Sequence, residues 1–483
     1  MHNSKLIDIH KTLSAQERRK FSEYIYSPLF NKHEKLVKLI DIITEEAPLY
    51  KGNALARKNI FHRLFPKEKY KEEKVSVLMT YMVTHIEYFL AYLNYDKHKT
   101  KKQLHLLAEL RERNMDDYFK RNLSVLKTTV DSYPYRNDSH YMNEYLMESE
   151  SDIFFAKKES RQQHDSIQKK ADSLTLFYLS SNLKNWCEMM NRKNIIAAEY
   201  DLGMLNDAVK YIKDNSKKLK DIPAIMIYYR ILLTLTESGK EEHYTALKEI
   251  LHKNSNKFSQ EEARQMYDYA QNYCIKKING GNTSYLKELF SLYKLLLENK
   301  IIFEEQYLPQ WDYKNIVSLG LRIEEYVWIE KFIHQYKEKI APEFRENAYV
   351  YNLAYYYYSK QEYKNALKLL QEIEFTDVFY NIDSKSMLLK IYYELEETES
   401  FYSLIDAFKM FLKRNKLISD YQYQANWNLT RLAKKIYRIR ATTFSTKKDS
   451  NKKKIEEVRT KIKESKSVAN VNWLNQKLEE LER

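Results

Sequence analysis

Apolar residues at helical spacing and helix-capping signals alternate along the first part of the chain. Ser14 followed by Glu17 predicts a capping box that opens a helix at "AQERRKFSEYIYS", and Pro28 ends that helix. Asn31 with Glu34 predicts the same device at the start of a second helix. A third helix is predicted near "ALARKNIFHRLF".

A long helix is predicted next, from about Lys69 to Tyr95. Its apolar residues recur every three or four positions, as on one helix face: Val75, Leu78, Met79, Met82, Ile86, Phe89, Leu90 and Leu93. Residues 1–130 are therefore predicted to form an N-terminal helical bundle. Three short helices also allow a helix-turn-helix interpretation, but a tight glycine-bearing turn and a separate recognition helix are not evident.

Residues 131–170 are predicted to connect two packed regions. The stretch "DSYPYRNDSH" at 131–140 carries turn residues and predicts a loop. The run "FFAKKESRQQHDSIQKK" is rich in charge, which favours an exposed helix after that loop.

The clearest pattern is a helical hairpin of about 34 residues. Its first helix has apolar positions on one face at Val350, Leu353, Ala354 and Tyr357. After "SKQE", the second helix has them at Tyr363, Ala366, Leu370 and Ile373. The same spacing returns 35 residues after Leu353, at Leu388, and 37 residues before it, at Ile316. Three such units in tandem indicate a repeat.

This pattern resembles the tetratricopeptide repeat (TPR), although Gln361 replaces the turn glycine and Val378 the closing proline. The resemblance implies an all-α fold, a right-handed α-solenoid of degenerate TPR-like hairpins over residues 171–440, with its clearest repeats at 310–415. Neighbouring hairpins would bury each other's apolar faces and leave a concave groove. The layout also resembles bacterial TPR-type proteins that lack an assigned function.

In proteins with this repeat, one face of each first helix lines the groove. The face that carries Tyr351, Tyr355 and Tyr358 takes that role here, while Tyr357 is predicted to be the core tyrosine of "YYYY". The groove residues implied by the resemblance are Trp311, Lys314, Arg322, Tyr351, Tyr355, Tyr358, Lys390 and Tyr393. Ser318 stands where an asparagine would complete the TPR carboxylate clamp, so that ligand is not implied. The groove is either open or filled by the protein's own side chains.

The chain changes character after residue 440. Residues 441–454 are polar and basic and predict a linker, and residues 455–483 predict two short amphipathic helices. These helices could fold into a hairpin, pack back on the solenoid or pair with another chain.

Composition supports an almost wholly helical protein. The chain of 483 residues has only 6 glycines and 7 prolines, which disfavours strand-rich folds and phosphate-binding loops. Its net charge of +14 would attract anionic partners if the cations were gathered on one face. An A/T-rich genome would also produce this lysine- and tyrosine-rich composition without any selection for binding.

No pattern of catalytic residues accompanies the repeats. The sequence contains no GxxxxGK[ST], GxGxxG, GxSxG or HExxH motif, so no catalytic, metal-binding or cofactor-binding residues are predicted. Cys187 and Cys274 fit buried, reduced thiols. With no signal peptide and no run of about 18 apolar residues, the chain is expected to be cytoplasmic and not membrane-bound.

The sequence therefore predicts a non-enzymatic scaffold or adaptor that binds a protein or peptide partner in the groove. The alternative is a helical-repeat protein that binds RNA or DNA through its basic surface, including the run "KKDSNKKK". A third hypothesis is self-association through the C-terminal helices.

Overall fold

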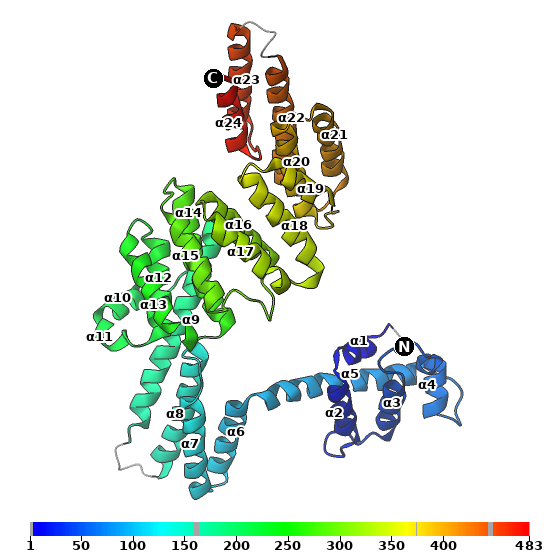
Figure 1. Cartoon of the computed structure of the whole chain (residues 1–483). Helices are drawn as coiled ribbons and strands as arrows, with labels where there is room; N and C mark the ends of the chain where they lie inside the picture. Colours follow the sequence, from blue (N-terminus) through cyan, green and yellow to red (C-terminus); the bar gives the residue numbers. More distant parts are fainter. Residues whose placement is uncertain (1–2, 159–163, 197, 373, 443–447, 483) are drawn as a thin grey trace. The chain divides into compact units, whose positions relative to one another are not determined.

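The computed structural model describes residues 3–158, 164–196, 198–372, 374–442 and 448–482, and within them every regular element is a helix (Figure 1). The all-α prediction is thus confirmed. The chain divides into two compact units, Met1–Asn182 and Leu183–Arg483. Among the helices in these ranges, none has the length and apolar character needed to cross a bilayer.

The first unit is built from short helices followed by longer ones. They are α1 Lys5–Thr12, α2 Ala15–Tyr26, α3 Glu34–Glu45, the 3₁₀ turn η1 Asn53–Leu55, α4 Arg57–Leu64, α5 Glu72–Lys97, α6 Lys99–Glu112, α7 Asp116–Asp131 and α8 Asp138–Lys158. Helix α9, Ser166–Ile196, contains the boundary between the two units.

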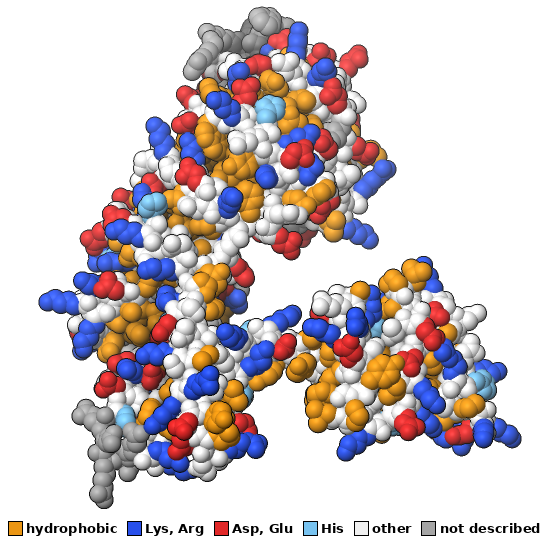
Figure 2. Space-filling model, turned by 60° about the horizontal axis from the view of Figure 1, so that its bottom comes forward, with side chains coloured by type: hydrophobic (Ala, Val, Ile, Leu, Met, Phe, Trp, Pro, Cys, Tyr) orange, Lys and Arg blue, Asp and Glu red, His pale blue; other side chains and the backbone are white. Residues whose placement is uncertain are grey.

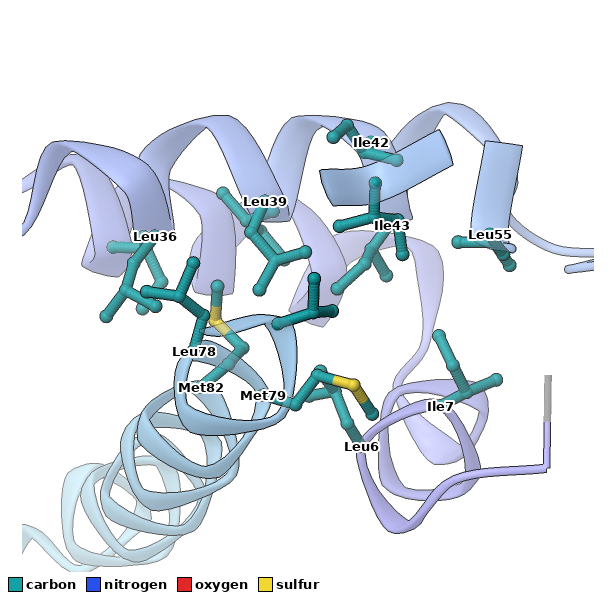
Figure 3. Close-up of a cluster of buried hydrophobic side chains, with 14 of the residues drawn as sticks. Leu6, Ile7, Leu36, Leu39, Ile42, Ile43, Leu55, Leu78, Met79 and Met82 are labelled. Atoms are coloured by element: carbon teal, nitrogen blue, oxygen red, sulfur yellow. The ribbon is translucent and has the colours of Figure 1, made fainter. Parts of the chain in front are cut away.

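A single apolar cluster holds α1 to α5 together. Leu39 and Ile43 of α3 lie opposite Met79 and Met82 of α5, and Ile7 of α1 lies at the edge of the same cluster (Figure 3). The face predicted for the long helix is confirmed except at its end, because Leu90 is exposed. Helix α5 packs against each of α1 to α4, so its long apolar face provides the core contact that these four helices share.

One predicted capping box is confirmed and the other is wrong. The backbone N–H of Glu17 donates to Ser14 Oγ at 3.2 Å, and that of Ser14 donates to Glu17 Oε2 at 2.8 Å. At α3 the cap is His33, not Asn31. The Asn31 amide instead donates to the Ile25 carbonyl at 2.9 Å and accepts from the His33 N–H, so it fixes the loop before the helix.

The prediction of an exposed connector at 131–170 is wrong for α8. This helix packs against α6 and α7, and the rings of Phe119 and Phe154 stack with centroids 4.1 Å apart. The charged run contributes its phenylalanines to this core, an outcome that its overall composition does not reveal. The loop is shorter than predicted, since α7 ends at Asp131 and α8 begins at Asp138. Residues 159–163 of the run lie outside the described ranges.

The second unit consists of paired helices. They are α10 Leu205–Asp214, α11 Ser216–Leu219, α12 Pro223–Thr236, α13 Glu241–Asn254, η2 Ser255–Lys257, α14 Gln260–Asn279, α15 Tyr285–Glu298, α16 Gln310–Arg322, α17 Tyr326–Gln335, η3 Lys337–Lys339, α18 Pro342–Ser359, α19 Tyr363–Glu372, α20 Val378–Glu394, α21 Thr398–Arg414, α22 Asp420–Thr442, α23 Lys448–Glu464 and α24 Val471–Glu482. From α16 to α21, each odd-numbered helix packs against the even-numbered one before it, and α16, α18 and α20 pack in sequence.

The same turn joins the three predicted hairpins. Glu324, Gln361 and Glu396 all have a positive φ, of 63°, 62° and 60°. The N–H of the residue that follows each of them donates to a carbonyl five positions back, for example Glu362 to Tyr357 at 2.9 Å. This is a Schellman motif, in which glycine usually takes the left-handed position. Gln361 therefore has the left-handed backbone conformation that glycine favours at such a turn.

The prediction for the tyrosines of α18 is partly wrong. Tyr351 and Tyr356 are the buried ones, at 7% and 2% exposure, whereas Tyr357 is half-buried. The reason is that α18 packs against α16, α17, α19 and α20, so its neighbours cover more than one face. A prediction based on a single apolar face cannot anticipate this. In α19, Ala366 and Leu370 are buried as predicted, while Ile373 lies outside the described residues.

The two predicted C-terminal helices are present and pack back on the second unit. Leu474 and Leu478 of α24 and Ile455 of α23 join one apolar cluster with Leu389 of α20 and Leu432 of α22. The linker predicted at 441–454 is shorter than expected, because α22 runs to residue 442 and α23 starts at 448. Residues 443–447 lie outside the described ranges.

Candidate partner-binding site

The first part of the site is a lysine surrounded by aromatic rings. Lys314 Nζ of α16 lies 5.3 Å from the ring centroid of Trp311, 5.2 Å from that of Tyr351 and 5.5 Å from that of Tyr380. Its ammonium also forms an ion pair with Asp383. Trp311 and Tyr380 stack at 5.3 Å, with ring planes 9° apart. Three successive first helices, α16, α18 and α20, thus contribute to one arrangement of rings and charges.

The rings continue along α18. Tyr351 and Tyr355 stack at 6.3 Å, and Tyr355 and Tyr358 at 6.5 Å, because residues four and three apart share a helix face. Lys390 Nζ of α20 lies 4.8 Å from the Tyr358 ring. We call the connected rings of Trp311, Tyr380, Tyr351, Tyr355 and Tyr358 the aromatic strip. Trp311 is 39% exposed, and Tyr355 and Tyr358 are half-buried, so these three rings reach solvent.

Burial changes the acidity of the groups along the strip. It raises the pKa of the Tyr351 hydroxyl, and the nearby Asp383 carboxylate raises it further. Desolvation lowers the pKa of Lys390 to about 8, against the opposing effect of Asp383 and Glu394. The Lys390 ammonium donates to the Asn470 side chain at 3.3 Å, a neutral acceptor. A carboxylate brought to Lys390 would therefore stabilise its charged form.

The C-terminal helix closes one end of the strip. Lys477 of α24 pairs with Glu394 of α20 at 2.7 Å, and Trp473 Nε1 donates to the same carboxylate at 3.3 Å. Tyr393 lies beneath them at 2% exposure, in edge contact with Trp473. Its predicted place on the groove surface is wrong, because α24 packs over it. At this end the chain's own side chains fill the predicted groove.

The structure thus brings together six of the eight predicted groove residues. They are Trp311, Lys314, Tyr351, Tyr355, Tyr358 and Lys390. Arg322 is exposed and makes no ring contact with the strip among the described residues. Sequence reasoning missed Tyr380 and Asp383. Asp383 lies seven residues before Lys390, hence on the same helix face, and this spacing could have identified it.

The residues of the site offer aromatic ring faces and charged groups as contacts. Within the described residues, no group of three or more His, Cys, Asp or Glu side chains is placed to hold a metal ion. Cys187 and Cys274, in the helices α9 and α14, are buried, and burial raises the pKa of both thiols. On the face shown in Figure 2, Lys and Arg side chains are interspersed with Asp and Glu. Comparisons with protein-family models, with curated proteins and with solved structures found no significant match to this chain.

Proposed function

We propose that the protein is a non-enzymatic scaffold or adaptor whose second unit is a TPR-like α-solenoid and binds an extended, carboxylate-bearing peptide segment along the aromatic strip. Support for the solenoid comes from the three hairpins with equivalent turns and from the sequential packing of α16, α18 and α20. Support for peptide binding comes from the strip itself. Rigid rings supply contact area at low conformational-entropy cost, and cations between them attract carboxylates.

The observation that carries this proposal is the combination at Tyr358 and Lys390. The Tyr358 ring is half-buried, and the ammonium beside it is desolvated and hydrogen-bonded to an amide. A desolvated lysine gains more from an anionic ligand than a fully hydrated one does. A peptide carboxylate at this position would form a charge-assisted hydrogen bond to Lys390 while its neighbouring residue contacts the ring.

The test compares partner capture by three forms of the tagged chain from its native lysate after nuclease treatment. The first is the unaltered chain, the second carries Trp311→Ala and Tyr355→Ala, and the control carries Val327→Ala and Lys331→Ala. The control residues are exposed on α17, the second helix of the hairpin that carries Trp311. We expect quantitative mass spectrometry to show proteins that the strip variant loses at least fivefold and the control retains.

A synthetic peptide from the captured partner then locates the contact. Its affinity should fall as the pH rises from 7 to 9, because Lys390 loses its charge near pH 8, and Lys390→Met should remove this pH dependence. Thermal unfolding establishes that each variant is folded. Equal capture by the folded strip variant and the unaltered chain would contradict the proposal.

A further inference from the structure

A second surface, on α21, α22 and α23, gathers cations. On α22, Arg431, Lys434 and Lys435 lie at helix positions i, i+3 and i+4 and therefore share a face. Helix α22 lies between α21 and α23 (Figure 1). The neighbouring helices add Lys409 and Lys413 from α21 and Lys461 from α23. We call these six residues the basic face: Lys409, Lys413, Arg431, Lys434, Lys435 and Lys461.

Aromatic rings lie beneath three of these cations. Lys409 Nζ and Lys413 Nζ lie 5.2 Å and 5.3 Å from the ring centroid of Trp427, and this ring stacks on Tyr423 at 5.6 Å. Lys434 Nζ lies 5.2 Å from the ring of Tyr402. These ring contacts favour the observed positions of three ammonium groups, which reduces the side-chain entropy lost when a ligand binds.

Few acids neutralise the basic face. Residues 409–440 contain nine Lys or Arg and one acid, Asp420. Nearby cations lower the pKa of two members of the basic face. At Lys435 the largest cause is the side-chain contact with Lys461. At Lys409 the largest cause is burial, and the charge of Lys434 lowers the pKa further. Asp406 and Glu457 oppose these shifts only in part. The neighbouring Arg440 and Arg459 form ion pairs with carboxylates. Among the described residues, no ion pair joins a carboxylate to any of the six cations of the basic face.

We propose that the basic face binds the phosphate backbone of a single-stranded nucleic acid. A bound polyanion reduces the repulsion between neighbouring ammonium groups. Its phosphates would supply the negative charge that nearby carboxylates supply only in part. From Arg431 to Lys435, α22 rises by about 6 Å, or roughly two nucleotide steps of one strand at ~3.4 Å each. Tyr421, 71% exposed at the start of the same helix, offers a ring on which a base can stack. This inference does not rest on the function proposed for the aromatic strip.

The test measures binding of a fluorescein-labelled 20-nucleotide poly-U RNA by anisotropy at about 50 mM salt. The unaltered full chain should bind, with an affinity that falls steeply as salt rises. Replacing Arg431, Lys434 and Lys435 by Gln should weaken binding at least tenfold. It should also reduce the slope of log K against log salt by about 2, because each lost phosphate contact contributes about 0.7 for a single strand.

The matched control removes three positive charges elsewhere in the same unit, through Lys213→Gln, Lys217→Gln and Lys218→Gln. These lysines are exposed on α10 and α11, and this variant should bind within about threefold of the unaltered chain. Equal loss in both variants, or no binding of the unaltered chain at 50 mM salt, would overturn the proposal. So would binding to phosphatidylserine vesicles without binding to the RNA.

A second measurement avoids substitution altogether. Photocrosslinking of the unaltered chain to RNA containing 4-thiouridine should place crosslinks in peptides that contain Tyr421 or Trp427. Crosslinks confined to peptides outside α21 to α23 would overturn the proposal, even if the triple variant were to lose its fold.

Discussion

At the scale of single residues, burial without full hydrogen bonding marks where the protein is sensitive to pH. His10 is completely buried in the core of the first unit, and its Nδ1 lies 2.8 Å from the Tyr50 hydroxyl oxygen. Burial, and secondarily the charge of Arg18, lowers its pKa to about 4. The imidazole is therefore neutral in the folded protein at pH 7, and charging it inside the core is unfavourable.

This histidine should make the first unit less stable as the pH falls below about 6.5. Between pH 6.5 and 4 the unfolded chain binds a proton that folded His10 does not, so acidification favours unfolding. At pH 5 the loss is about 2 kcal/mol, because each pKa unit corresponds to about 1.4 kcal/mol. Melting temperatures measured between pH 7 and 5 should fall less steeply in His10→Gln than in the unaltered chain. His33→Asn, at an exposed position, should follow the unaltered chain. Parallel curves for all three proteins would contradict this assignment.

At the scale of helices, the backbone conformation of the turns is more regular than their amino-acid sequence. Glu324, Gln361 and Glu396 differ from glycine, yet all three adopt the left-handed conformation after a first helix. The hydrogen bonds of the Schellman motif and the packing of the second helix impose this conformation on residues that do not favour it. The turn sequences are therefore suboptimal and leave room for stabilisation.

Replacing Gln361 by Gly should raise the free energy of unfolding by about 0.5–1 kcal/mol. The substitution removes the strain of a residue with a Cβ in the left-handed conformation. The greater conformational entropy of glycine in the unfolded chain offsets part of this gain. Gln361→Val should lower stability, since a branched Cβ is disfavoured at positive φ. The control Lys364→Gly, at an exposed position of α19, should lower it by about 1 kcal/mol. Guanidinium denaturation followed by circular dichroism provides these values, and a Gln361→Gly variant no more stable than the unaltered chain would contradict the argument.

At the scale of the whole molecule, local signals predicted helices well and their neighbours less well. Low glycine and proline content, the capping box at Ser14 and the apolar spacing around Leu353 depend on residues close in sequence. The burial of Tyr356 and Tyr393 depends on helices that pack from elsewhere, namely the partners of α18 and the distant α24. For the same reason, the face of each first helix predicted six residues that the structure brings together, but it did not predict that Trp473 packs on Tyr393.

The boundary between the units illustrates the same limit, and it leads to a prediction for the whole chain. It lies between Asn182 and Leu183, inside α9, where no proline, glycine or charge run marks it, because contacts far apart in sequence define it. Calorimetry should resolve two unfolding transitions. Leu39→Ala in the core of the first unit should lower only one of them, and Leu432→Ala in the second unit only the other. Removing a buried leucine side chain costs about 2–5 kcal/mol, or roughly 5–15 °C for a unit of this size. One transition that both substitutions lower would instead show that the two units unfold as one.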